Sequence, residues 1–233
     1  MSNKKKKQVK LSIDLSATVD LNSHLLPKIE VNNVVSTFDV GVNQLPLKEI
    51  AQKFSFCEYQ PSRFAALTAR VVMKNFDNHR TTALAFASGR LVCTGSRSVC
   101  MCLLAARRYV RLFQRLGYSE LSFCDFSIQN IVSSVHLGFP LKLEEMAEDY
   151  GPYCSYEPDL FPGLSLRTSS LVFLCFRSGK CVITGGQNML NIKKIFVHVY
   201  FQILKCYRDT DNLNTSSSDY RKFSKRRRML LEM

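Results

Sequence analysis

Residues 86–95 read FASGRLVCTG, and residues 176–185 read FRSGKCVITG. Each stretch joins two apolar strands through a Ser-Gly turn and ends in Thr-Gly, which is the pattern of a β-hairpin. Upstream, VNNVVST at 31–37 is matched by IQNIVSS at 128–134. The chain therefore contains one unit twice, and two copies of about 90 residues are too few for a solenoid. We predict a single α+β domain with pseudo-twofold symmetry.

The spacing of phenylalanines shows where the two copies differ in length. Phe64 precedes Phe86 by 22 residues, whereas Phe161 precedes Phe176 by 15. We therefore expect one hairpin loop, around residues 74–79, to be longer in the first copy, while the rest of the two copies superposes.

Each copy has the same predicted order of elements: an opening strand, a short helix, a bend containing proline, three or four strands and a longer helix. The opening strands and the helices are predicted at residues 33–40, 45–54 and 98–116, and again at 127–137, 141–150 and 189–205. The copies occupy residues 28–125 and 126–208. A flexible basic arm (1–27) and a disordered basic tail (209–233) are expected on either side.

Alternation along the repeated hairpin separates two faces of the predicted sheet. One face combines large apolar side chains with hydroxyl groups and a cation, at Thr82, Leu84, Phe86, Arg90, Val92 and Thr94 and at Val172, Leu174, Phe176, Lys180, Val182 and Thr184. The other face is small and apolar, as at Ala83, Ala85, Leu91 and Cys93. We predict helices on this second face only. The first face is then left open for a partner.

Most of the net charge of +13 lies at the chain ends, with five lysines in residues 1–10 and six basic residues in 221–233. Such runs are typical of nuclear-import signals or flexible electrostatic arms. No apolar stretch is long enough to predict a membrane span, and none follows the N-terminal lysines as a secretory signal would require. The nine cysteines lack a CxxC pair, so we expect reduced core thiols, such as Cys93, Cys175 and Cys181, and no metal site.

The predicted helix at 98–116 is amphipathic. A basic ridge, defined as Arg107, Arg108, Arg111 and Arg115, lies on one side, and the helix contains no acidic residue to pair with it. An apolar stripe of Met101, Leu104, Ala105, Leu112 and Leu116 is expected to pack on the sheet. The ridge favours an acidic partner or nucleic acid, although a plain soluble surface is the alternative for any single arginine.

Several motifs together resemble the family of TATA-binding proteins, from about residue 28 to 207. They are YxPxRFAA (59–66), RTTALxFxSG (80–89), VCTG (92–95), LAARxY (104–109) and SYEPDLFPGL (155–164). The resemblance implies a pseudo-twofold saddle, in which a curved ten-stranded antiparallel sheet carries its helices on the convex face. It also implies that the concave face binds the DNA minor groove and bends A·T-rich promoter DNA, since strand readout, bending and apolar wedging are established properties of this family.

The family pattern assigns roles to individual residues. The resemblance implies wedging between base pairs by Phe64, Phe86, Phe161 and Phe176. It implies base or groove contact by Asn33, Val35, Leu84, Val92, Thr94, Asn130, Val132, Leu174, Val182 and Thr184. It implies phosphate contact by Arg63, Arg70, Arg90, Arg167 and Lys180. It implies partner binding by Glu157, Asp159 and Leu160 and by the basic ridge.

The resemblance also implies the wider setting. The expected function is nucleation of a transcription preinitiation complex in the nucleus, with double-stranded TATA-like DNA, factors like transcription factors IIB and IIA, TBP-associated factors and RNA polymerase machinery as partners. A homodimer of the free protein is plausible because the open face is apolar, whereas neither a membrane partner nor a cofactor is expected. The alternative is a related paralogue that acts mainly as a protein-interaction scaffold with altered DNA preference.

The four histidines are scattered and no nucleophile, paired carboxylates or phosphate loop is visible, so an enzyme is not predicted. Arg177 stands where the family usually has a small or apolar residue, and alternation places it on the side of the sheet away from DNA.

Overall fold

The computed structural model describes residues 26–208, with the side chains of 202–206 left aside. The predicted tail at 209–233 and all but the last two residues of the predicted arm at 1–27 lie outside this range. Two compact units make up the described chain: residues 30–133 with 184–189, and residues 134–183 with 26–29 and 190–208.

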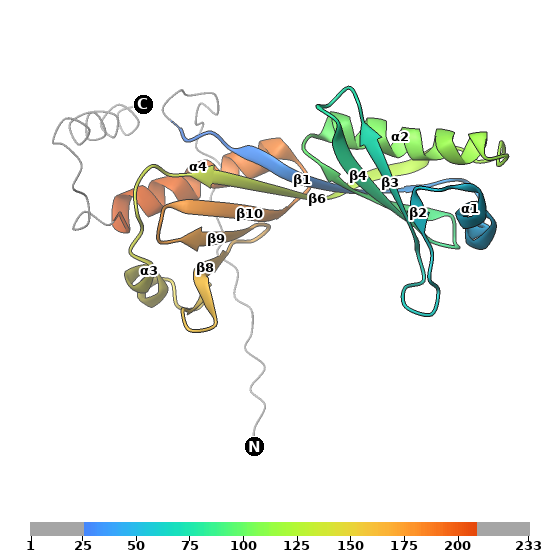
Figure 1. The fold of residues 1–233 in the computed structure, drawn as a ribbon. Coiled ribbons are helices and arrows are strands. Elements are labelled where there is room, and N and C mark those ends of the chain that lie inside the picture. The colour runs from blue at the N-terminus through green and yellow to red at the C-terminus, as the bar shows by residue number, and fades with distance from the viewer. Residues whose placement is uncertain (1–25, 209–233) are drawn as a thin grey trace, which may run out of the picture. The chain divides into compact units, whose positions relative to one another are not determined.

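Ten strands form one sheet in the order β2-β3-β4-β5-β1-β6-β10-β9-β8-β7 (Figure 1). The second half of this order repeats the first in reverse, so the predicted antiparallel α+β fold built from two copies of one unit is confirmed. The strands are β1 (Glu30–Asp39), β2 (Cys57–Glu58), β3 (Leu67–Met73), β4 (His79–Ala85), β5 (Arg90–Ser96), β6 (Cys124–His136), β7 (Cys154–Glu157), β8 (Phe161–Arg167), β9 (Val172–Phe176) and β10 (Lys180–Gly186).

In the first unit, helix α2 (Val99–Arg115) covers the small apolar face of the sheet, and the short helix α1 (Leu47–Lys53) follows β1 (Figure 1). Ala83, Ala85, Leu91 and Cys93 are fully buried, as alternation predicted. The Ser98 side chain caps α2 by accepting a hydrogen bond from the Met101 amide at 3.1 Å. Because these small side chains face α2, the basic, hydroxyl-bearing and large apolar side chains of the same strands lie on the opposite face of the sheet.

The predicted apolar stripe of α2 is partly wrong. Leu104 is 42% exposed and Leu112 is half-buried, whereas Cys102, Ala106, Tyr109 and Phe113 form the buried side with Met101 and Ala105. The large rings decide this rotation, because Tyr109 packs fully inside and donates from its hydroxyl to the Thr81 carbonyl at 2.7 Å.

In the second unit, α3 (Leu143–Asp149) and α4 (Met189–Cys206) take the places of α1 and α2. The sheet residues Phe173, Cys175, Cys181 and Ile183 are buried. Helix α4 contributes an apolar side to the same core, with Ile192, Ile195, Phe196 and Val199 almost completely buried. The helix-covered face and the open face therefore alternate along these strands as they do in the first unit.

The predicted difference in hairpin length is confirmed. Strands β3 and β4 remain paired to Met73 and His79, whereas β8 and β9 end their pairing at Arg167 and Val172. The first hairpin thus has three further residue pairs and one more turn residue, which accounts for the seven extra residues.

Within residues 26–208, no helix is long and apolar enough to cross a membrane. The same residues contain no group of three His, Cys, Asp or Glu side chains that could hold a metal ion. Cys93, Cys175 and Cys181 are free and buried, as predicted, whereas Cys100 is exposed.

Candidate nucleic-acid interface

Two asparagines occupy equivalent places, each next to a glycine near the end of a strand. The Gly95 amide donates to Asn33 Oδ1 at 2.8 Å, and the Gly185 amide donates to Asn130 Oδ1 at 2.9 Å. Both glycines have φ near +90° (90° and 94°), in the left-handed region that a side chain disfavours. Both conformations therefore depend on glycine, and in each of them the backbone amide donates to the asparagine.

These bonds fix which edge of each asparagine is free. Because a backbone N–H can only donate, the atom that faces Gly95 or Gly185 must be the amide oxygen. One hydrogen of Nδ2 is given to a threonine, with Asn33 donating to Thr94 Oγ1 and Asn130 to Thr184 Oγ1, both at 3.1 Å. Each amide retains a second N–H, so both asparagines can donate to an acceptor.

The four predicted wedges form two pairs of aromatic rings, one in each unit. Phe64 and Phe86 meet edge to face at 6.4 Å between ring centroids, and Phe161 and Phe176 at 5.8 Å. Phe64 is 48% exposed and Phe161 is 45% exposed, which is unusual for rings of this size. Each pair thus presents an apolar edge to solvent, supported from behind by its partner ring.

Gly163 explains the closer approach of the second pair. A Cβ atom at this position would lie 2.6 Å from Phe161 Cε1 and 3.0 Å from Phe176 Cε1. The equivalent position in the first copy is Ala66, and the rings there stand farther apart. Sequence reasoning quoted Gly163 as part of a motif but did not assign it to the site.

The predicted groove-floor residues all lie half-buried on the open face. They are Val35, Leu84, Val92 and Thr94 around the first half, and Val132, Leu174, Val182 and Thr184 around the second. Thr68 and Ser165, which sequence reasoning missed, are half-buried on the same face opposite Leu84 and Leu174. Period-two alternation along residues 67–73 and 161–167 was the signal that could have found them.

The five predicted phosphate contacts, Arg63, Arg70, Arg90, Arg167 and Lys180, are all exposed. Arg70 lies 3.8 Å from Glu58 in an exposed ion pair, which costs little to exchange for a phosphate. Arg70 is paired with Thr82 across β3 and β4 and therefore faces the same way as the floor residues.

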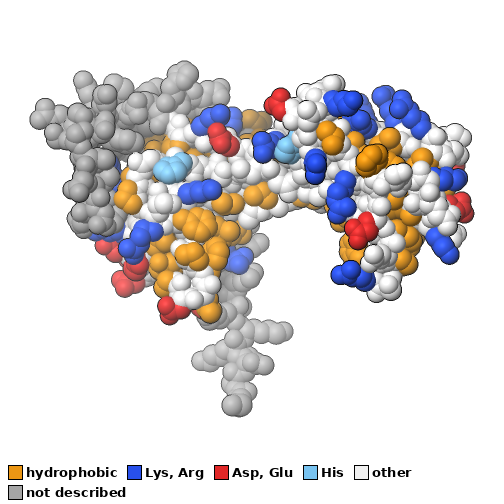
Figure 2. Space-filling view, in the orientation of Figure 1, with side chains coloured by type: hydrophobic (Ala, Val, Ile, Leu, Met, Phe, Trp, Pro, Cys, Tyr) orange, Lys and Arg blue, Asp and Glu red, His pale blue; other side chains and the backbone are white. Residues whose placement is uncertain are grey.

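The predicted partner-binding residues lie on other surfaces. Glu157, Asp159 and Leu160 are exposed where β7 turns into β8, and Leu160 is 81% exposed. The basic ridge is exposed on α2, and Figure 2 shows Lys and Arg side chains clustered over this helix. The guanidinium of Arg107 stacks over Phe123 at 5.6 Å, so it also has a packing role.

Comparison with known proteins identifies the family behind this geometry. Residues 28–116 and 125–207 match the family described as "Transcription factor TFIID (or TATA-binding protein, TBP)". The TATA-box-binding protein of Acanthamoeba castellanii is 43% identical over 85% of this chain and 75% of its own length. TATA-box-binding protein 1 of Arabidopsis thaliana is 42% identical over 79% and 90%.

A solved structure supports the same assignment. The chain is similar to that of Methanococcus jannaschii TBP, with a TM-score of 0.64 and 29% identity, over 77% of this chain and 99% of that one. The two family repeats coincide with the two copies that carry the asparagine–glycine pairs and the phenylalanine pairs. The chain belongs to the TATA-binding protein family.

Proposed function

We propose that this protein binds the minor groove of A·T-rich promoter DNA, bends it with its two phenylalanine pairs and nucleates assembly of a preinitiation complex. The observation that carries the proposal is the duplicated asparagine site. In the minor groove, A·T pairs offer only acceptors, at adenine N3 and thymine O2, so two fixed, uncharged N–H donors suit them.

The open face supplies the remaining chemistry. Bulky floor side chains such as Val92 and Val182 leave no acceptor for the amino group of guanine, which disfavours G·C pairs. A ring inserted between base pairs replaces part of the stacking lost when the step opens. The exposed cations around the face contribute the salt-dependent part of the affinity through release of counterions from phosphates.

The other surfaces fit an assembly role. The exposed acidic and apolar turn at Glu157, Asp159 and Leu160 suits a factor like transcription factor IIB. The basic ridge on α2 suits acidic regulators, including factors like IIA, and TBP-associated factors and polymerase machinery complete the proposed partners. We propose a nuclear, non-enzymatic role, with the open face covered in a homodimer when DNA is absent.

The second candidate is a TBP-related paralogue that acts mainly as a scaffold with altered DNA preference. The feature that favours it is the extended β3–β4 hairpin, which exposes Lys74, Asn75, Asp77 and Asn78. Retention of all four phenylalanines and both asparagines favours direct DNA binding over this candidate.

The decisive experiment compares binding and bending of a TATA duplex with a G·C-substituted duplex at fixed salt. The wild type is expected to bind and bend the TATA duplex more strongly, and a Phe64→Ala/Phe161→Ala variant to lose the bend. Because both rings are about half exposed, the variant should stay folded, which thermal unfolding checks. Weak binding that ignores both sequence and substitution would support the scaffold instead.

A further inference from the structure

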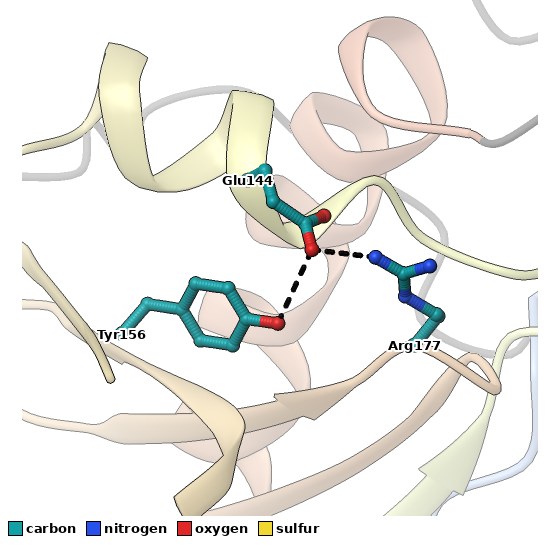
Figure 3. Close-up of polar contacts among 3 residues, drawn as sticks. All are labelled: Glu144, Tyr156 and Arg177. Atoms are coloured by element: carbon teal, nitrogen blue, oxygen red, sulfur yellow. Dashed lines mark hydrogen bonds and ion pairs between the residues drawn. The ribbon is translucent and has the colours of Figure 1, made fainter. Parts of the chain in front are cut away.

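One carboxylate in the second unit joins three elements of the fold (Figure 3). Glu144 Oε1, in the first turn of α3, accepts a hydrogen bond from Arg177 Nη2 at 2.5 Å and another from the Tyr156 hydroxyl at 3.4 Å. Tyr156 belongs to β7, and Arg177 lies in the turn between β9 and β10. We call these three residues the Glu144 clamp.

The first copy has different chemistry at the same places. The Leu45 amide donates to the Ala87 carbonyl at 2.7 Å, and the Leu141 amide donates to the Arg177 carbonyl at 2.9 Å. This shared backbone bond makes Ala87 the counterpart of Arg177, and it makes Lys48 the counterpart of Glu144. A methyl group and an ammonium group cannot form the ion pair, so the clamp distinguishes the two halves.

The clamp holds both chain segments that lead to the second wedge pair. Phe176 comes directly before Arg177, and Phe161 follows Tyr156 by five residues. The rings of Phe161 and Phe176 touch at a centroid distance of 5.8 Å. Holding both segments in the bound geometry reduces the conformational entropy that must be lost when the rings enter DNA.

We propose that Glu144 is a positioning residue that pre-organises the Phe161–Phe176 wedge, so that the second half engages DNA more readily than the first. This inference rests on the proposed minor-groove function. The side chains of Arg177 and Glu144 are 62% and 55% exposed, so solvent weakens their attraction. The expected effect is therefore modest, roughly a two- to fivefold change in DNA affinity.

The test uses Glu144→Gln and Arg177→Ala with Glu145→Gln as the matched control. Glu145 is the next residue of the same helix and pairs with Lys142 at 3.2 Å, so its substitution removes the same charge and an ion pair without touching the β9–β10 turn. Affinity for a TATA duplex is measured at two salt concentrations, together with 2-aminopurine fluorescence at each kinked step. Hydrogen exchange of amides 177–180 is followed in the free protein.

Both clamp variants are expected to weaken binding about two- to fivefold, to lower the kink signal and to speed exchange in the turn, while Glu145→Gln stays like the wild type. The double variant Glu144→Gln/Arg177→Ala should be no weaker than Arg177→Ala alone, because both substitutions remove the same ion pair. Grafting the clamp into the first half with Lys48→Glu/Ala87→Arg should strengthen binding.

Other outcomes separate the two levels of the proposal. If the wild type binds and bends the TATA duplex but Glu144→Gln behaves like Glu145→Gln, the positioning role is wrong and the proposed function stands. If Glu144→Gln binds more tightly with a steeper salt dependence, Glu144 instead withholds Arg177 from phosphate, and the positioning role is again wrong. If the wild type neither binds nor bends the duplex, the proposed function itself fails.

Discussion

Replacing Asn33 by aspartate tests the asparagine site with the smallest possible change in shape. The new carboxylate can still accept the hydrogen bond from the Gly95 amide and the one from the Thr94 hydroxyl, which Asn33 now accepts at 2.8 Å and 3.2 Å. Only the donor edge changes, because Nδ2 becomes a second acceptor oxygen. The fold should therefore be kept, with a change in unfolding free energy within about 1 kcal/mol.

Binding should respond much more strongly than folding. The outward edge of the side chain would present an acceptor to the acceptors of an A·T pair, and leaving such a group unpaired costs about 1–3 kcal/mol. The added negative charge next to phosphates increases this cost at low salt. A loss of about 2 kcal/mol corresponds to roughly a 30-fold weaker affinity for a TATA duplex at 25 °C.

The assay is equilibrium binding by fluorescence anisotropy, repeated at several salt concentrations, with urea unfolding on the same samples. Asn130→Asp is the internal replicate, because Asn130 has the same set of partners at nearly the same distances. Wild-type affinity for Asn33→Asp, with the protein folded, would refute the assignment of the asparagine amides as donors to DNA.

Three further outcomes are expected. Gly163→Ala should reduce DNA bending with little loss of stability, because the new methyl group would push the half-exposed ring of Phe161 away from the ring of Phe176. A bend assay checks this, with Ala66→Gly as the reciprocal change in the first copy. Unchanged bending by Gly163→Ala would contradict the prediction. Tyr109→Phe should destabilise the fold by about 1–2 kcal/mol in urea unfolding, because a buried hydroxyl that donates to the Thr81 carbonyl is lost. Burial raises the pKa of Cys154 from 9.0 to about 12. The thiol of the unfolded chain therefore loses its proton at lower pH than that of the folded chain, and stability should fall as pH rises from 9 to 12. Cys154→Ala should flatten that part of the pH–stability curve, and an unchanged slope would show that burial of Cys154 does not cause the fall.

The sequence predicted the open face well because alternation along a strand is a local property. Residues 82–94 and 172–184 could be sorted into two faces without knowing their neighbours, and burial of Ala83 and Cys93 matches that sorting. The rotation of α2 was harder to predict. Leu104 and Tyr109 both fit an amphipathic pattern. In the structure the ring of Tyr109 is buried over the sheet and its hydroxyl donates to the Thr81 carbonyl, whereas Leu104 is exposed.

By itself, the sequence determined the repeat, the positions of its strands and helices and the matched phenylalanines and asparagines, because these depend on periodicity and on comparison of one copy with the other. Tertiary structure alone decided how the distant residues meet. Asn33 accepts a hydrogen bond from Gly95, which lies 62 residues further along the chain, and Glu144 pairs with Arg177, which lies 33 residues further along. Hydrogen bonds and ion pairs act over a few ångströms and leave no periodic pattern in the chain, so the orientation of the asparagine amides and the Glu144 clamp appeared only once the sheet had brought those segments together.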